Sequence, residues 1–179
     1  SAAGFLVAKE LAYIGGVRSG FSFWEFDYQV EPVIREILRT GTVPDYRSHN
    51  FFSTGERMGR LVVELADIQD EDDILEPEAG QAGIAQFLPP ERTTCVEISK
   101  LHCGVLIAKG YTTICTDFLT WNPGKLFRKI VMNPPFSAGR AIDHVKHAAT
   151  LLHPNGKLVA IMPASAYGKT LVDGWAHEW

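Results

Sequence analysis

Long apolar runs and a basic leader are both missing from this sequence of 179 residues. No apolar stretch approaches the roughly 18–20 residues that span a membrane, and residues 1–15 lack the basic start and apolar centre of a signal peptide. We therefore expect no membrane partner. The remaining composition, 46% hydrophobic and 21% charged, is typical of a soluble globular domain.

Cysteine is scarce. The sequence has three cysteines, an odd number, and their spacing matches no zinc signature: Cys95, Cys103 and Cys115. We expect reduced thiols in the core of a cytoplasmic protein, and no metal site. A Walker-type lysine is also missing, so transfer of a nucleotide phosphoryl group is not indicated.

Basic residues are missing from one segment and concentrated in another. Leu61 to Glu91 contains nine acidic residues and no Lys or Arg, whereas Lys125 to Lys157 contains six basic residues and one acid. The net charge of −4 does not itself indicate nucleic-acid binding. Either these are solvated charged surfaces, or an anionic substrate approaches the second segment.

From residue 51 onward, short apolar strands alternate with helical segments. The predicted strands are 74–76, 93–98, 112–118, 129–132 and 157–163. The predicted helices are one within 51–68, a short one ending at 88, one over 99–109 and one over 139–152. Apolar strands separated by helices indicate an α/β fold, a Rossmann-like, doubly wound and mostly parallel sheet with helices on both faces.

Some local details are also predicted. Ser53 stands three residues before Glu56, the spacing of a capping box at the start of the helix within 51–68. The apolar residues predicted to share one face of this helix are Met58, Leu61, Val62, Leu65 and Ile68. Residues 154–156, Pro-Asn-Gly, predict a turn before the last strand.

Residues 1–50 are predicted to form a helical and aromatic extension before a second unit over 51–179. Residues 27–40 have helical spacing, and Gly41 is a suitable residue to follow the helix. The stretch "GFSFWEFDYQ" is rich in aromatic residues. Packing in the core or against a partner is favoured over a base-stacking platform.

Polar residues end four of the apolar strands. They are Glu76, Glu97, Asp117 and Asn133. In open α/β sheets, ligands bind outside the carboxyl ends of the strands. These four side chains are therefore predicted to face one ligand site.

The first three strand ends suggest an adenosine-containing cofactor. Gly80 and Gly83 follow the first strand, where glycine lets the backbone approach a ligand closely. Glu97 lies 21 residues after Glu76, the position of an acid that accepts hydrogen bonds from ribose hydroxyls. Asp117 can accept a hydrogen bond from an adenine amino group, and Phe118 can cover the adenine ring.

The stretch "NPPF" at 133–136 suits a planar amino group. The Asn133 side-chain oxygen and the Pro134 carbonyl are two acceptors for its two N–H bonds. Pro135 stiffens the loop and Phe136 offers a stacking face. The alternative is a proline stop at the end of a strand with a buried ring.

With these motifs the sequence resembles class I S-adenosylmethionine-dependent methyltransferases, in particular the N6-adenine DNA methyltransferases of phages, plasmids and bacteria. The resemblance covers roughly residues 51–165. It rests on "FFSTGER", "ILEPEAGQAGIA", "VEIS", "TDFL" and "VMNPPFSAGRAIDHVKHA". Enzymes that methylate guanine N2 in RNA or glutamine in proteins also contain NPPF, so they remain alternatives.

The resemblance implies S-adenosylmethionine as cofactor and DNA as partner, with 51–179 as the catalytic domain. Phe52 and Thr54 would contact the methionine part, and Glu76, Gly80 and Gly83 would shape its pocket. The resemblance further implies these roles: ribose binding by Glu97, adenine binding by Asp117 and Phe118, and target-base binding by Asn133, Pro134, Pro135 and Phe136. We expect the basic stretch 125–157 to surround this pocket and face a phosphate backbone.

Three residues depart from the family pattern. The family usually has Pro where Gly55 stands, a small residue at Glu78 and Gly at Ala82. The family's final antiparallel hairpin has no room after "KLVAIMP", so the C-terminal strands are expected to be missing and a partner chain could supply target recognition. These departures favour a third alternative, a non-catalytic module with a methyltransferase fold.

Overall fold

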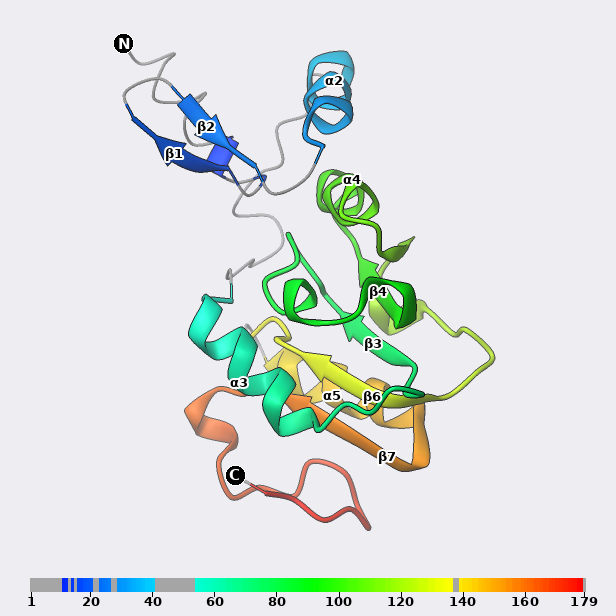
Figure 1. Cartoon of the computed structure of the whole chain (residues 1–179). Coiled ribbons are helices and arrows are strands. Elements are labelled where there is room, and N and C mark those ends of the chain that lie inside the picture. Colours follow the sequence, from blue (N-terminus) through cyan, green and yellow to red (C-terminus); the bar gives the residue numbers. More distant parts are fainter. Residues whose placement is uncertain are drawn as a thin grey trace.

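A computed structural model describes residues 11, 12, 14, 16–20, 23–26, 29–40, 54–136 and 139–178 (Figure 1). Its centre is a five-stranded sheet in the order β5-β4-β3-β6-β7, and every neighbouring pair is parallel. The strands are β3 (Ile74–Pro77), β4 (Thr93–Glu97), β5 (Thr112–Cys115), β6 (Phe127–Met132) and β7 (Leu152–Ala160). The predicted α/β fold with a parallel sheet is confirmed.

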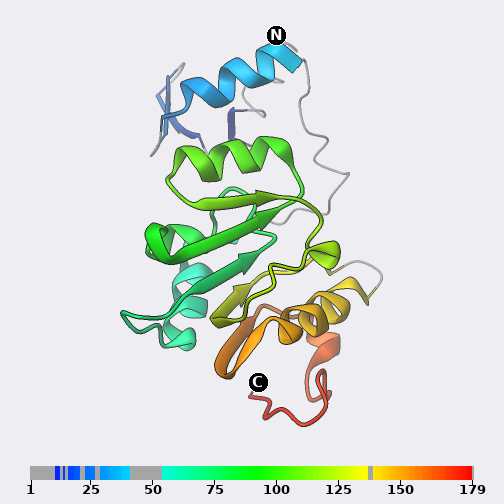
Figure 2. The ribbon, with the colours of Figure 1, turned by 90° about the vertical axis from the view of Figure 1, so that its right-hand side faces the viewer.

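Helices cover both faces of this sheet, because its strands are apolar on both sides. Ile74 of β3 packs against Val62 of α3 (Glu56–Ala66), while the next residue, Leu75, packs in the cluster that contains Val145 of α5 (Arg140–Thr150). Successive strand residues face opposite sides, so α3 and α5 lie on opposite faces, as Figure 2 shows. The helix α4 (Lys100–Ala108) packs through Leu106 on Cys95 of β4.

The N-terminal part packs against α4. The helix α2 (Glu31–Thr40) begins four residues later than predicted, and its Val33 lies in a buried cluster with Leu101 and Val105 of α4. Figure 2 shows α2 and α4 side by side. The sequence did not predict the short antiparallel hairpin of β1 (Val17–Ser19) and β2 (Phe23–Glu25).

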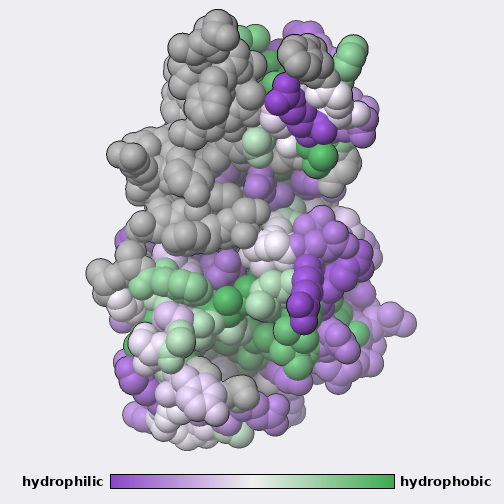
Figure 3. Space-filling view, turned by 90° about the vertical axis from the view of Figure 1, so that its left-hand side faces the viewer, coloured by the Kyte–Doolittle hydropathy of each residue, from purple (hydrophilic) through white to green (hydrophobic). Residues whose placement is uncertain are grey.

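The predicted start and buried face of α3 are partly wrong. Gly55 is the N-cap residue and makes no side-chain capping bond, so Glu56 begins the helix and cannot occupy the third position of a capping box. The buried face consists of Gly59, Val62 and Ala66. Three of the residues predicted to face the core are 44–50% exposed: Met58, Leu61 and Leu65. Figure 3 views the molecule from the side of α3, where apolar side chains gather.

Residues 154–156 do not form a turn ahead of the last strand. They lie within β7. Phe127 of β6 pairs with Leu152 and Lys129 pairs with Lys157, so β7 has more residues than β6 between these two pairs and forms a bulge there. A Cβ at Gly156 would lie 2.7 Å from the Arg128 carbonyl oxygen. Glycine is needed there because the two backbones approach closely.

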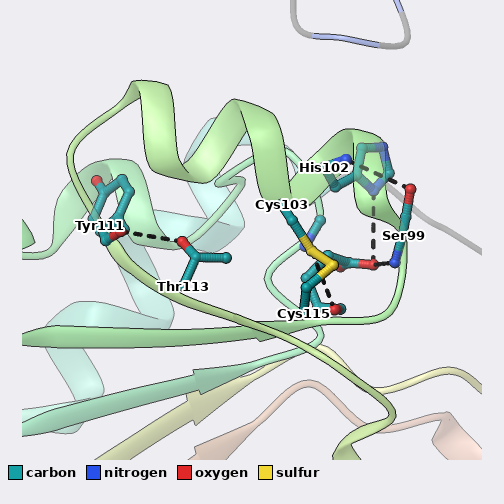
Figure 4. Close-up of a disulfide and its surroundings, with 8 residues drawn as sticks. Ser99, His102, Cys103, Tyr111, Thr113 and Cys115 are labelled. Carbon is teal, nitrogen blue, oxygen red and sulfur yellow. Dashed lines mark hydrogen bonds and ion pairs between the residues drawn. A yellow bond between two sulfur atoms is a disulfide. The ribbon is translucent and has the colours of Figure 1, made fainter. Parts of the chain in front are cut away.

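Two of the three cysteines form a disulfide, so the expectation of three reduced thiols is wrong. Cys103 of α4 is bonded to Cys115 at the end of β5, and Cys95 is a buried free thiol. Figure 4 shows this bridge beside Ser99 and His102. Among the described residues, no helix is both long and apolar enough to cross a membrane.

Candidate functional site

One cavity lies at the carboxyl ends of the strands, as predicted. It contains all four polar strand-end residues, and most of the other predicted residues surround them. The predicted residues that line it are Thr54, Glu76, Gly83, Glu97, Asp117, Phe118, Asn133 and Pro135. Gly80 and Pro134 are buried outside this lining, and Phe136 is 37% exposed. Phe52 lies outside the described residues.

Two backbone N–H groups hold the carboxylate of Glu97. Gly80 donates to Oε2 at 2.8 Å and Ser99 donates to Oε1 at 2.7 Å. His102 Nδ1 lies 3.9 Å from Oε1 (Figure 4). A carboxylate oxygen can accept more than one hydrogen bond. The Glu97 carboxylate can therefore also accept hydrogen bonds from the hydroxyl groups of a ligand.

The loop after β3 contains three residues with left-handed backbone. Gly80 has φ +55, and Glu78 and Ala82 have φ +56 and +72 although they are not glycine. A left-handed residue with a side chain costs about 1–2 kcal/mol, which explains why glycine suits position 82. The Ala82 methyl is buried in a cluster with Ala79, and Ala82 is not among the residues that line the cavity.

Glu76 presents a buried carboxylate to the cavity. It is 2% exposed, and its Oε2 has no hydrogen-bond partner among the described residues. Burial raises its pKa well above the ordinary value, although the N–H groups of Ala85 and Ile84 oppose this shift. A buried oxygen without a partner at a cavity wall is suited to a positively charged donor on a ligand.

The cavity also contains a hydrogen-bonded pair of side chains that the sequence did not predict. His144 Nδ1 of α5 is hydrogen bonded to Glu78 Oε1, and both residues line the cavity. Burial raises the pKa of Glu78, and the bond from His144 partly opposes that shift. Glu78 therefore does not stand in the site as an isolated negative charge.

Asp117 and Phe118 also have roles within the protein. Asp117 Oδ1 accepts a hydrogen bond from Leu119 N at 3.0 Å, which caps the 3-10 helix η3 (Phe118–Thr120). The Phe118 ring is 3% exposed and packs edge-on to His147, with ring centres 4.7 Å apart. Both residues still line the cavity, between β5 and α5.

Asn133 directly follows β6 and reaches across the cavity wall to the segment before α3. Its Nδ2 donates a hydrogen bond to Thr54 Oγ1 at 3.0 Å. Pro134 is buried and anchors the loop, Pro135 lines the cavity, and Phe136 is partly exposed. The amide is therefore tied to the segment before α3, on a loop that two prolines stiffen.

The sequence did not predict several lining residues: Glu78 as the hydrogen-bond partner of His144, Ser99, His102, Thr116, Arg140 and His144. One signal was available, because Arg140 and His144 stand four residues apart on the helix that follows NPPF. Residues at this spacing share one helix face. The apolar residues of this helix predict its core side, and two of its polar residues, Arg140 and His144, line the cavity.

The basic stretch 125–157 does not surround the cavity, so that expectation is wrong. Arg140 is its one Lys or Arg residue among the lining residues. Lys125 Nζ lies 3.4 Å from Asp73, and Lys129 Nζ donates to the Asp67 carbonyl oxygen at 2.7 Å. These two lysines stand before and early in β6, away from its carboxyl end.

No protein-family model matches the sequence, and no curated protein is significantly similar to it. Solved structures are similar in fold. Glycopeptide N-methyltransferase MtfA complexed with S-adenosylmethionine has a TM-score of 0.51 and 16% identity, covering 72% of this chain and 64% of that one. Coclaurine N-methyltransferase bound to N-methylheliamine and SAH has a TM-score of 0.50 and 16% identity, covering 58% and 33%.

TrmN from Thermus thermophilus has a TM-score of 0.51 and 19% identity, covering 61% of this chain and 38% of that one. The chain thus spans between about one third and two thirds of the length of these three proteins. The sheet has the Rossmann-like α/β fold of class I methyltransferases.

Proposed function

We propose that this chain binds S-adenosylmethionine at the carboxyl ends of its strands and transfers the methyl group to an exocyclic amino nitrogen. One observation carries this proposal: Glu76, Glu97, Asp117 and Asn133 lie at or just after the carboxyl ends of four different strands and line one cavity. The cofactor named in the MtfA complex supports the same assignment.

The cavity suits a cationic cofactor. Four carboxylates line it, from Glu76, Glu78, Glu97 and Asp117. S-adenosylmethionine carries a sulfonium and an ammonium group, and the buried Oε2 of Glu76 fits an ammonium donor. Glu97 would hold the ribose hydroxyls, while Asp117 and Phe118 would hold the adenine.

The two departures from the family pattern at the cofactor loop are compatible with such a site. The Ala82 methyl is buried in a cluster with Ala79 and does not itself line the cavity, so we expect it not to crowd the cofactor. The Glu78 carboxylate is paired with His144. Both observations weaken the case for a non-catalytic module.

The target group would be held at the NPPF loop. S-adenosylmethionine, when bound, supplies an electrophilic methyl group on a sulfonium centre. The Asn133 side-chain oxygen and the Pro134 carbonyl oxygen would accept hydrogen bonds from the two N–H groups of the target amino group. This arrangement would favour a tetrahedral geometry at the amino nitrogen, which exposes its lone pair. Phe136, which is 37% exposed, would stack on a planar ring.

We propose N6 of adenine in DNA as the acceptor, with the base extruded from the duplex. A stacking ring fits a flat base better than a glutamine amide. The choice of adenine over guanine N2 in RNA is supported by the resemblance of "FFST" and "DHVKHA" to the DNA enzymes. Target recognition is proposed to come from a partner chain.

The test is incubation with labelled S-adenosylmethionine and, separately, unmethylated DNA, RNA or protein. Products are digested and identified by mass spectrometry. We expect N6-methyladenine from DNA, and no transfer by Asn133→Ala, which should still bind the cofactor in calorimetry. N2-methylguanosine or methylglutamine would replace the proposed acceptor, and absence of both binding and transfer would overturn the function.

A further inference from the structure

Thr54 and Asn133 are 79 positions apart in the sequence and joined by a hydrogen bond. The family resemblance assigns Thr54 to the methionine part of the cofactor. In the structure its hydroxyl oxygen instead accepts a hydrogen bond from Asn133 Nδ2, at 3.0 Å. The segment before α3 therefore contacts the target-binding loop as well as the cofactor cavity.

Close packing fixes the position of Thr54. A Cβ at Gly83 would lie 3.1 Å from both the Cβ and the carbonyl oxygen of Thr54. A Cβ at Gly59 of α3 would lie 2.6 Å from the Gly83 carbonyl oxygen. The absence of side chains at both glycines lets Thr54 and the start of α3 pack directly on the loop after β3.

The orientation of the Asn133 amide decides which ligands it can bind. Its oxygen only accepts hydrogen bonds and its nitrogen only donates them. An amino group that enters the site needs hydrogen-bond acceptors. An Asn133 amide rotated by 180° would turn its own NH2 group toward the amino group, and two donors cannot form a hydrogen bond. Because the amide is planar, an amide that donates its Nδ2 to Thr54 has Oδ1 turned to the other side.

We propose that Thr54 is a positioning residue whose hydroxyl, through its hydrogen bond with the Asn133 side chain, holds this amide in place for the amino group that is methylated. This inference rests on the proposed methyl transfer and deepens it. Thr54 acts through Asn133, so its hydroxyl contributes to the methyl-transfer rate more than to cofactor affinity.

The test compares Thr54→Val, which keeps the shape and removes the hydroxyl, with Thr54→Ser, which keeps the hydroxyl. Single-turnover transfer from saturating labelled S-adenosylmethionine to unmethylated DNA should slow about 10- to 100-fold in T54V, as expected for a misplaced catalytic group. T54S should restore most of the rate. The cofactor dissociation constant should change less than about twofold in either variant, because the lost bond belongs to Asn133.

Thr113→Val is the matched control. Thr113 is half-buried on β5, its hydroxyl donates to the Tyr111 carbonyl at 3.1 Å, and it does not line the cavity. An unchanged rate in T54V, or a loss of rate matched by an equal loss of cofactor affinity, would overturn the inference. A parent chain that transfers no methyl group to DNA, RNA or protein would instead refute the proposed function.

A measurement without catalysis keeps the inference testable in that case. The two Nδ2 protons of Asn133 can be assigned by NMR from their absence in Asn133→Asp. Their chemical shifts should move in T54V and stay near the parent values in T54S. Identical shifts in the parent and T54V would show that Thr54 does not hold the amide.

Discussion

His144 Nδ1 is hydrogen bonded to the carboxylate of Glu78, which connects α5 to the loop after β3 at the wall of the cavity. Their side chains are 6% and 19% exposed. Because both side chains are largely buried, water has little access to form hydrogen bonds in place of a missing partner. Both remaining polar atoms, His144 Nε2 and Glu78 Oε2, have no hydrogen-bond partner among the described residues.

We therefore expect His144→Ala to destabilise the fold at neutral pH. Removing the histidine leaves a largely buried carboxyl group without its hydrogen-bond partner, which should lower the free energy of unfolding by about 1–3 kcal/mol. Urea denaturation measures this value, with His153→Ala in the β7 bulge as control. In a double-mutant cycle, Glu78→Gln and His144→Ala should be non-additive by about 1–2 kcal/mol. Additive effects would show that the pair is not coupled.

Ala82→Gly should leave both stability and cofactor affinity nearly unchanged. The change relieves about 1–2 kcal/mol of left-handed strain, removes about 0.8 kcal/mol of methyl burial and adds about 0.4–1 kcal/mol of unfolded-state freedom. The net change in unfolding free energy should lie within about 1 kcal/mol of zero by urea denaturation.

Calorimetric measurement of S-adenosylmethionine affinity then tests whether a side chain in this loop crowds the cofactor. Gly83→Ala is the matched comparison, because a Cβ there would press on Thr54, and we expect it to weaken cofactor binding. A clear gain of S-adenosylmethionine affinity in A82G would contradict the buried position of its methyl group.

Reducing the disulfide should destabilise the chain. Cys103 and Cys115 are 12 positions apart, and closing a loop of this size contributes about 3 kcal/mol in the chain-entropy description. Urea denaturation with and without a thiol reductant measures the difference. The double variant Cys103→Ser/Cys115→Ser should not respond to reductant, whereas Cys95→Ser should respond as the parent does. An unresponsive parent would show that the bridge is not formed.

The sequence predicted those features that depend on short stretches of chain. Alternation of apolar strands and helices specified the parallel sheet, because strands buried on both faces need apolar residues throughout. The site residues at the strand ends followed from the same pattern, since the carboxyl ends of parallel strands meet at one edge. Glu76 and Asn133 could therefore be assigned to one site from sequence.

Contacts between distant segments were not predictable in this way. Thr54 with Asn133, and Glu78 with His144, are 79 and 66 positions apart and carry no local pattern that pairs them. The same applies to Cys103 and Cys115, which approach only because α4 packs back on β5. The α3 face was misassigned because small residues form its buried side, Gly59 against the loop after β3 and Ala66 against the sheet, while larger apolar side chains face outward.

The buried carboxyl group of Glu76 should make the fold less stable as the pH rises, while it supports binding of S-adenosylmethionine. Burial raises its pKa above the ordinary value of 4.5, so the folded chain holds this proton more tightly than the unfolded chain does. The stabilising contribution is complete below pH 4.5 and is lost as pH rises through the folded-state pKa. Glu76→Gln cannot ionise, so its thermal midpoint should exceed that of the parent at pH 8, by less at pH 5.

The same substitution should weaken S-adenosylmethionine binding by about 1.5–3 kcal/mol, the usual range for a hydrogen bond to a charged group. In the parent, affinity should rise with pH, because the ionised carboxylate is the form that accepts a cationic donor and binding then releases a proton. Calorimetry in two buffers of different ionisation enthalpy measures this proton. Glu64→Gln, on the exposed side of α3, is the matched control and should change neither property. An E76Q variant that is less stable at both pH values would mean that the carboxylate stabilises the fold, and its assignment to the ligand would lose its physical basis.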